Sequence, residues 1–252
     1  MSIDKNIFTK ELLLAKDAAK KAGDYLIKNK STLNTSLFSN KKDIKLQADI
    51  SAENLIKKII SSESSIPILA EESGMSSDNV DKIFWVVDPL DGTANFSRDI
   101  PICCVSIALV EKLEPIMGVI YDFTNKDLYE GSIYSKAAVN DQDISVSKIS
   151  NPEEGILITG LPNATDYSNN ALQEMIKNFQ DWRKIRMIGS AAMASVYVAS
   201  GKADLYTEKR TYLWDIAAGA AIVNAAGGRA IISNQNSKFQ VDVTFSNSNL
   251  KL

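Results

Sequence analysis

The chain carries the segment Trp85-Val86-Val87-Asp88-Pro89-Leu90-Asp91-Gly92-Thr93, in which an apolar run ends in two aspartates. Residues 83–87 have the composition of a buried strand. The proline that follows has a fixed φ and biases the aspartate before it toward an extended conformation. Gly92 tolerates a positive φ or a close backbone approach. The segment therefore predicts a turn that aims both carboxylates and the Leu90 carbonyl oxygen at one point.

Oxygen ligands of this kind suit Mg²⁺, which also binds the phosphate oxygens of substrates. The backbone N–H groups of Gly92 and Thr93 follow directly, at an expected helix start. Such N–H groups form a natural anion site. Metal ligands beside a phosphate site indicate transfer of a phosphoryl group to water.

The composition is that of a soluble globular protein, with 252 residues of which 45% are hydrophobic and 23% are charged. The net charge of -3 weighs against a general nucleic-acid binder. The chain has no histidine, which excludes a Ser-His-Asp triad and every histidine-ligated metal site. Its two cysteines, Cys103 and Cys104, are too few for a structural zinc site and are expected in or near the core.

Nothing in the sequence predicts export or a membrane partner. The segment Met1–Lys5 is polar, and no run of 18 apolar residues occurs. Low cysteine usage fits a reducing cytosol. We therefore expect a cytoplasmic protein that binds neither membrane nor nucleic acid.

Hydrophobic periodicity predicts helices and strands in both halves of the chain. Helices are expected over residues 9–29, 49–63, 171–179, 190–199 and 215–226. Strands are expected over residues 66–70, 83–87, 105–111, 115–121, 127–131, 156–160, 184–188 and 203–207. The polar segment 29–43 is expected to be a mobile loop. The mixture indicates α/β or α+β layering.

Four acidic residues lie at the ends of predicted elements: Glu71, Asp88, Asp91 and Asp215. Each one alone is typical of a solvated turn or of a helix N-cap. The group as a whole predicts a metal site made of carboxylates, which is chemistry that a chain without histidine can perform.

Several motifs of this sequence resemble those of the inositol monophosphatase superfamily, a group of magnesium-dependent, lithium-sensitive phosphatases. The most specific matches are residues 85–96 and 214–219. Weaker matches lie at residues 47–49, 70–73 and 189–192. The resemblance covers almost the whole chain, and the order and spacing of five matches make chance an inadequate explanation.

The resemblance implies two or three Mg²⁺ ions per active site. Glu71, Asp88 and the Leu90 carbonyl match the ligands of a first metal ion. Asp88, Asp91 and Asp215 match the ligands of a second. Glu71 also matches a residue that reaches a weaker third ion through water.

The resemblance also implies catalytic and substrate-binding roles. Thr93, paired with Asp49, matches a dyad that orients the attacking water, and Glu71 takes part in catalysis. Substrate contacts are expected from Gly92, Thr93, Ser190, Ala191, Glu208 and Arg210. Glu208 matches an acid that contacts substrate hydroxyls. Lys209-Arg210 departs from the family pattern, and this pair is read either as a second anion contact or as a solvated loop or dimer contact. Lys41 and Lys42 are read either as residues that approach the site or, as is more common for such residues, as part of a solvated charge run.

The fold implied by the resemblance is a layered αβαβα sandwich. An N-terminal α+β half, residues 1–137, would carry most metal ligands. A C-terminal α/β half, residues 138–252, would carry Asp215 and substrate contacts. The active site would lie between the halves, and a homodimer is expected.

The resemblance leaves the substrate open. Asn95-Phe96 favours a phosphatase of inositol 1-phosphate or a related sugar phosphate. The alternatives are a 3'(2'),5'-bisphosphate nucleotidase acting on phosphoadenosine phosphate, and a fructose-1,6-bisphosphatase. A non-catalytic alternative is a regulatory protein that binds RNA polymerase or the ribosomal machinery.

Overall fold

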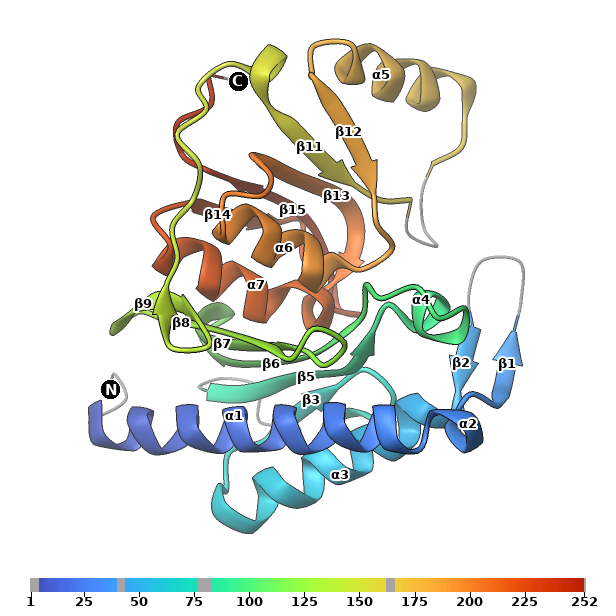
Figure 1. Cartoon of the computed structure of the whole chain (residues 1–252), viewed down its shortest axis with the longest axis vertical. Helices are drawn as coiled ribbons and strands as arrows, with labels where there is room; N and C mark the ends of the chain where they lie inside the picture. Colours follow the sequence, from blue (N-terminus) through green and yellow to red (C-terminus); the bar gives the residue numbers. More distant parts are fainter. Residues whose placement is uncertain (1–4, 40–43, 77–82, 162–165, 252) are drawn as a thin grey trace.

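The computed structural model describes residues 5–39, 44–76, 83–161 and 166–251. Within them, two β-sheets alternate with three layers of helices (Figure 1). Helices α1 (Lys5–Lys28) and α3 (Gln47–Glu63) cover the outer face of the larger sheet. Helices α6 (Ala191–Ala199) and α7 (Leu213–Ala225) lie between the sheets, and α5 (Asn169–Phe179) lies beyond the smaller one. The predicted αβαβα fold class is confirmed.

The larger sheet contains eight strands in the order β10-β9-β8-β7-β6-β5-β3-β4. Their bounds are β3 Ile68–Ala70, β4 Gly74–Met75, β5 Ile83–Asp91, β6 Cys104–Glu111, β7 Glu114–Asp122, β8 Asp127–Ser132, β9 Ser135–Val139 and β10 Gln142–Asp143. Strands β3 and β5 are parallel, whereas the other neighbours are antiparallel. The carboxyl ends of β3 and β5 therefore lie at the same edge of the sheet.

The smaller sheet contains five strands in the order β12-β11-β13-β15-β14. Their bounds are β11 Ile156–Thr159, β12 Lys184–Met187, β13 Leu205–Tyr212, β14 Arg229–Ser233 and β15 Gln240–Ser246. Strand β11 is parallel to β12 and β13, and β15 is antiparallel to both of its neighbours. The chain passes from the larger sheet to the smaller one after Asp143, through a short 3₁₀ helix at Pro152–Glu154.

Short elements complete the described chain. Helix α2 (Lys30–Leu33) follows α1, and strands β1 (Ser36–Ser39) and β2 (Ile44–Leu46) form an antiparallel pair. Helix α4 (Thr93–Ser97) follows β5. No helix of the described chain is long and apolar enough to cross a membrane.

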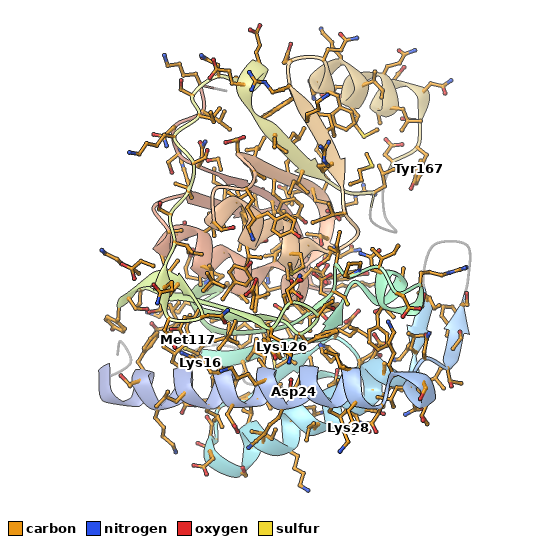
Figure 2. The ribbon with its side chains drawn as sticks, viewed as in Figure 1. Lys16, Asp24, Lys28, Met117, Lys126 and Tyr167 are labelled. Carbon is orange, nitrogen blue, oxygen red and sulfur yellow. The ribbon has the colours of Figure 1, made fainter. Side chains whose placement is uncertain are left out.

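Small side chains bring α1 close to the larger sheet. Ala15, Ala18 and Ala22 of α1 are fully buried. Lys16 and Asp24 of α1 are labelled in Figure 2, and each makes a polar contact with the sheet. Lys16 Nζ lies 2.7 Å from Glu130 Oε2, and the Tyr121 hydroxyl donates to Asp24 at 3.1 Å. Apolar burial supplies the bulk of the stability of this layer, because polar contacts of this kind contribute little.

Helix α7 is apolar on every side because it packs between the two sheets. At Gly118 of β7, a Cβ atom would lie 2.1 Å from the Ala218 carbonyl oxygen of α7. At Gly219, a Cβ atom would lie 2.2 Å from Ser195 Cβ of α6. Glycine is therefore needed at both contacts for the helix to reach its neighbours.

Three sequence predictions need correction. The segment 29–43, predicted to be a mobile loop, contains α2 and β1 in its described part, while residues 40–43, including Lys41 and Lys42, lie outside the described residues. The strand predicted over 203–207 begins at Leu205 and continues to Tyr212, because it pairs with β15. Strands β14 and β15 were not predicted, although burial alternates along β15 as expected for a half-buried strand.

Candidate active site

A cavity of about 540 Å³ opens where the two sheets face each other. It is lined by the end of β5, the start of α4, the start of α6, the end of β11 and the junction of β13 with α7. Its acidic lining residues are Glu71, Asp88, Asp91, Glu208 and Asp215. The structure thus brings together, at one cavity, all four acids that the sequence singled out.

Strand β5 reaches the cavity through a β-bulge, whereas the sequence predicted a turn. Asp88 pairs with Ser106 of β6 and Asp91 pairs with Cys104, so β5 has one extra residue between these pairs. Pro89 has no N–H to donate to the neighbouring strand. It is tolerated inside a central strand because the bulge interrupts the hydrogen bonding between the strands at this position. The bulge brings Asp88, the Leu90 backbone and Asp91 to the cavity wall.

Glu71 and Asp88 lie side by side because β3 and β5 are parallel. The Glu71 amide donates to the Val87 carbonyl at 3.1 Å, and the Leu90 amide donates to Asp88 Oδ1 at 2.9 Å. Burial, and then the charges of neighbouring acids, raise the pKa of both carboxyl groups well above the usual range. Glu71 is exposed, whereas Asp88 is only 2% exposed, so solvent screening reduces this effect more at Glu71 than at Asp88.

Asp91 connects the larger sheet to the start of α6. Its Oδ2 accepts hydrogen bonds from Ser190 Oγ at 2.5 Å and from the Ala192 amide at 2.7 Å. Burial raises the pKa of Asp91 to about 6, and these hydrogen bonds oppose the rise. Ser190 and Ala191 line the cavity, as predicted for substrate contacts, but the Ser190 hydroxyl is directed to Asp91.

Asp215 is the third residue of α7, and the preceding strand holds it in place. Its Oδ2 accepts from the Tyr212 amide at 2.9 Å and from Thr211 Oγ1 at 2.6 Å. Burial, followed by the charge of Asp91, raises its pKa to about 7. Asp215 and Asp91 therefore line the same cavity, Asp215 from the start of α7 and Asp91 from the end of β5.

Thr93 and Asp49 form a hydrogen-bonded pair at the cavity wall. Thr93 Oγ1 lies 2.8 Å from Asp49 Oδ1 and 3.0 Å from the Leu90 carbonyl oxygen. Asp49 is buried behind Thr93 as the third residue of α3, and its Oδ2 accepts from the Leu46 amide at 2.7 Å. Burial raises the pKa of Asp49, and the Thr93 hydroxyl opposes that rise. Asp49 itself does not line the cavity.

A positive φ of 89° at Gly92 starts α4 directly after the bulge. A Cβ atom at Gly92 would lie 2.7 Å from the Ile102 carbonyl oxygen, so a side chain there would clash as well as strain the backbone. Asn95 of α4 donates through Nδ2 to the carbonyls of Ile102 and Ile188, both at 2.8 Å. Helix α4 is thereby tied to the segment that leads into α6.

Glu208 lies at the end of the cavity formed by the smaller sheet. Its Oε2 accepts from the Tyr206 hydroxyl at 2.9 Å. Burial raises its pKa to about 7, and Tyr206 opposes the rise. Gly160 of the adjoining β11 end leaves room for this carboxylate, because a Cβ atom there would lie 2.4 Å from Glu208 Oε2.

Arg210 does not line the cavity, in contrast to the prediction of a substrate contact. A bulge in β13 lies between Glu208 and Thr211, and Arg210 adopts a φ of 59° within it. Its amide donates to Asp242 Oδ1 at 2.8 Å, and its side chain is exposed. The bulge therefore separates the backbone of this residue from the regular pairing of β13 with β15.

The chemistry of the donor set fits divalent metal ions. Within the described chain, no three acidic or thiol groups are close enough to ligate one ion as they are placed. A metal site made of Glu71, Asp88 and the Leu90 carbonyl contains only two acids and a backbone oxygen, so the finding on groups of three acids does not concern it. The acids raise one another's pKa, and Glu71 shares a hydrogen bond with Asp88. A divalent cation would replace such shared protons, so the crowded carboxylates suit one.

Three residues that support the site were not predicted. Tyr206 orients Glu208, and Thr211 orients Asp215. Asn95 joins α4 to the loop before α6. For Thr211 the spacing of four residues before Asp215 was the available signal. The partners of Asn95 lie too far away in sequence for a local pattern to reveal them.

Comparisons with known proteins agree with this architecture. A solved structure of extragenic suppressor protein SuhB from Bartonella henselae superposes with a TM-score of 0.85, at 30% identity, and covers 95% of each chain. The Nus factor SuhB of Xylella fastidiosa is 36% identical over 215 residues, which is 84% of this chain and 78% of that protein. The inositol-1-monophosphatase of Synechocystis is 34% identical over 194 residues, 74% of this chain and 66% of that protein.

The layered sandwich and its acid-lined cavity define the fold class of the inositol monophosphatases. The model of the inositol monophosphatase family matches residues 9–249. The chain belongs to the inositol monophosphatase family, and this membership supports a phosphatase.

Proposed function

We propose that the protein is a magnesium-dependent phosphomonoesterase that hydrolyses inositol 1-phosphate or a related sugar phosphate with an activated water. The observation that carries the proposal is the convergence of Glu71, Asp88, Asp91 and Asp215 on one cavity, beside the Thr93–Asp49 pair. These residues come from the larger sheet and from helices α3, α4 and α7, so only the folded chain assembles them.

The acids divide into two groups that would hold Mg²⁺. Glu71, Asp88 and the Leu90 carbonyl would hold one ion. Asp88, Asp91 and Asp215 would hold the other once their carboxylates draw closer together than the structure places them. When bound, Mg²⁺ lowers the pKa of its water and neutralises phosphoryl oxygens. Ser190 and the start of α6 keep Asp91 in place, while Thr211 keeps Asp215 in place.

Thr93 would orient the attacking water. Its hydroxyl proton is directed to Asp49, so its oxygen can accept a hydrogen bond from a water molecule. Asp49 is buried and receives the Leu46 amide, which fixes the direction of the pair. Gly92 lets the backbone at the start of α4 approach a phosphate closely.

Glu208 would bind the leaving group. A carboxylate accepts hydrogen bonds from neighbouring hydroxyl groups, which suits a polyol or sugar. Glu208 and Thr93 both line the cavity, whose volume of about 540 Å³ leaves room for such a group.

A substrate panel tests the proposal. Purified protein with millimolar Mg²⁺ is assayed for phosphate release from inositol 1-phosphate, fructose 1,6-bisphosphate and 3'-phosphoadenosine 5'-phosphate. We expect turnover of inositol 1-phosphate, and a loss of at least about 100-fold in Asp88→Asn. Asp17→Asn, an exposed acid on α1, is the matched control and should keep full activity. Exclusive turnover of the nucleotide would replace the inositol proposal by a bisphosphate nucleotidase.

A regulatory binding function is the second candidate, and the similarity to a Nus factor favours it. It predicts no phosphate release from any substrate of the panel, together with co-purification of RNA polymerase or ribosomal components with the tagged protein.

We also propose a cytoplasmic homodimer, for which light scattering should give twice the chain mass. A monomeric mass would remove the dimer without affecting the phosphatase proposal.

A further inference from the structure

Glu53 is a buried acid that has no part in the cavity described above. It lies in α3, one turn after Asp49, and is 3% exposed. Residues four apart on a helix share a face. Glu53 therefore points toward the same part of the molecule as Asp49, but toward a different partner.

That partner is the turn at residues 71–73, directly after β3. Glu53 Oε2 accepts a hydrogen bond from the Glu72 amide at 2.8 Å. The amide of Glu71 donates to the Val87 carbonyl. Two successive backbone amides are thus fixed, one by β5 and one by α3, and the backbone of Glu71 lies between these two anchors.

Two lysines complete the attachment of this turn. Lys57 Nζ donates to Ser73 Oγ at 2.7 Å and lies 3.7 Å from Glu53 Oε1. Lys45 forms an ion pair with the Glu72 carboxylate. Glu53 thus binds the turn at a backbone amide, whereas the two lysines bind the side chains of the turn.

A buried carboxylate carries a desolvation cost that an apolar residue would avoid. Glu71, by contrast, is exposed, and its backbone amide is fixed by β5, so the direction of its side chain depends on how the turn is held. A metal ligand must be held to within about 0.5 Å of its working position. The contact to Glu53 supplies that constraint.

We propose that Glu53 is a positioning residue for Glu71 and thereby sets the affinity of the site for Mg²⁺. This inference rests on the proposed function. Helix α3 then serves the site twice: Asp49 orients Thr93, and Glu53 orients the turn that bears Glu71. Groups that orient metal ligands typically contribute 10–100-fold in metal affinity.

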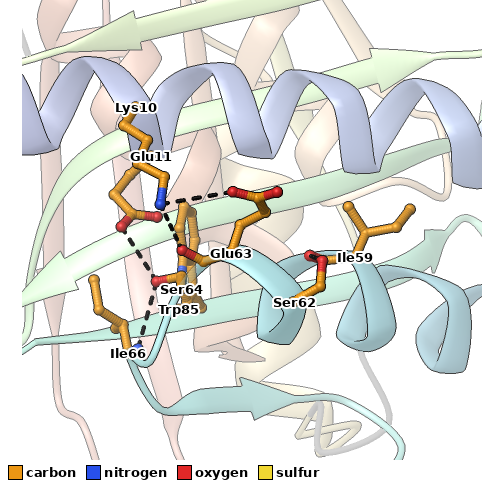
Figure 3. Close-up of polar contacts among 8 residues, drawn as sticks. All are labelled: Lys10, Glu11, Ile59, Ser62, Glu63, Ser64, Ile66 and Trp85. Atoms are coloured by element: carbon orange, nitrogen blue, oxygen red, sulfur yellow. Dashed lines mark hydrogen bonds and ion pairs between the residues drawn. The ribbon is translucent and has the colours of Figure 1, made fainter.

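Three variants of the full chain test the inference. Glu53→Ala removes the acceptor for the Glu72 amide, whereas Glu53→Gln keeps an oxygen acceptor in nearly the same shape. Glu11→Ala is the matched control, because Glu11 is also a buried acid of the helical layer and accepts a hydrogen bond from Ser64 Oγ at 3.2 Å, away from the cavity (Figure 3). The measurement is the Mg²⁺ concentration at half of the Mg²⁺-dependent rise in melting temperature, with calorimetric titration of Mg²⁺ beside it.

We expect the half-saturating Mg²⁺ concentration to rise about 10–100-fold in Glu53→Ala and to stay within about threefold of wild type in Glu53→Gln. Glu11→Ala should lower the melting temperature without changing the Mg²⁺ requirement. A folded Glu53→Ala with the wild-type Mg²⁺ requirement overturns the inference and leaves the proposed function standing. A folded Glu53→Gln as impaired as Glu53→Ala also overturns it. If Mg²⁺ does not change the melting temperature of the wild-type protein, both the proposed function and the positioning role of Glu53 are contradicted.

Discussion

Ser190 Oγ donates a 2.5 Å hydrogen bond to Asp91 Oδ2 across 99 positions of sequence. The same hydroxyl oxygen accepts from the Met193 amide at 3.2 Å, so Ser190 is also the N-cap of α6. Asp91 belongs to the larger sheet, whereas α6 lies between the sheets. The start of α6, where the helix dipole favours negative charge, therefore holds one of the acids of the site.

Ser190→Ala should destabilise the protein by about 1–2 kcal/mol, because it removes an N-cap and a hydrogen bond to a carboxylate. It should also raise the Mg²⁺ concentration needed for half of the stabilisation. Urea unfolding with and without Mg²⁺ measures both effects. Ser168→Ala removes the N-cap of the exposed helix α5 and is the matched control. Equal Mg²⁺ dependence in the two variants would contradict a role of Ser190 in holding Asp91.

The crowded acids predict an unusual dependence of stability on pH in the metal-free protein. The pKa is raised to about 6 at Asp91 and to about 7 at Asp215 and Glu208. Between the unfolded and folded pKa values, the folded state binds more protons than the unfolded state. The free energy of unfolding therefore falls as pH rises through this window. These three acids thus favour folding near pH 5 relative to pH 8.

Melting curves from pH 5 to pH 8 in EDTA test this prediction. We expect the melting temperature to decrease toward pH 8, and saturating Mg²⁺ to remove much of the decrease because the cation replaces the lost protons. Asp215→Asn should flatten the EDTA curve, whereas the exposed variant Asp17→Asn should leave it unchanged. A melting temperature that rises steadily toward pH 8 in EDTA would contradict the raised pKa values of these acids in the folded state.

Gly118→Ala should be strongly destabilising. Its Cβ would lie 2.1 Å from the Ala218 carbonyl oxygen, and a backbone atom of α7 cannot move aside as a flexible side chain can. Overpacking of this kind costs about 1–3 kcal/mol or more. Gly74→Ala is the control, because a Cβ at Gly74 meets nothing within 4 Å and only the positive φ opposes it. Urea unfolding should show the larger loss at Gly118, and the reverse order would contradict the tight packing of α7 on β7.

The acids of the site could be identified from sequence because each one follows a local signal. Glu71 and Asp88 each follow an apolar run of sequence, and Asp215 stands at the start of an apolar helix. These signals depend on a few neighbouring residues. The layered sandwich was predicted from family resemblance, since periodicity alone gives the elements and not their arrangement.

Features that depend on pairing between distant segments could not be predicted. The extension of β5 through Pro89 needs its bulge against β6, and a proline alone favours a turn. Arg210 stands two residues after Glu208, yet the bulge opposite β15 separates them. The hydroxyl of Ser190, at the start of α6, has its partner Asp91 in the larger sheet. Local patterns contain none of these partners.

Gly160→Ala should separate the position of Glu208 from the stability of the fold. The added Cβ would lie 2.4 Å from Glu208 Oε2, the far end of a flexible side chain, so the carboxylate moves at a cost below about 1 kcal/mol. Under the proposed function, KM for inositol 1-phosphate should rise about tenfold, because a hydroxyl contact of about 1.4 kcal/mol is lost. Turnover of an aryl phosphate without hydroxyls on its leaving group should change less than twofold. Glu208→Gln should give the same pattern. An equal loss with both substrates, in a variant that melts like wild type, would show that Glu208 does not contact the leaving group.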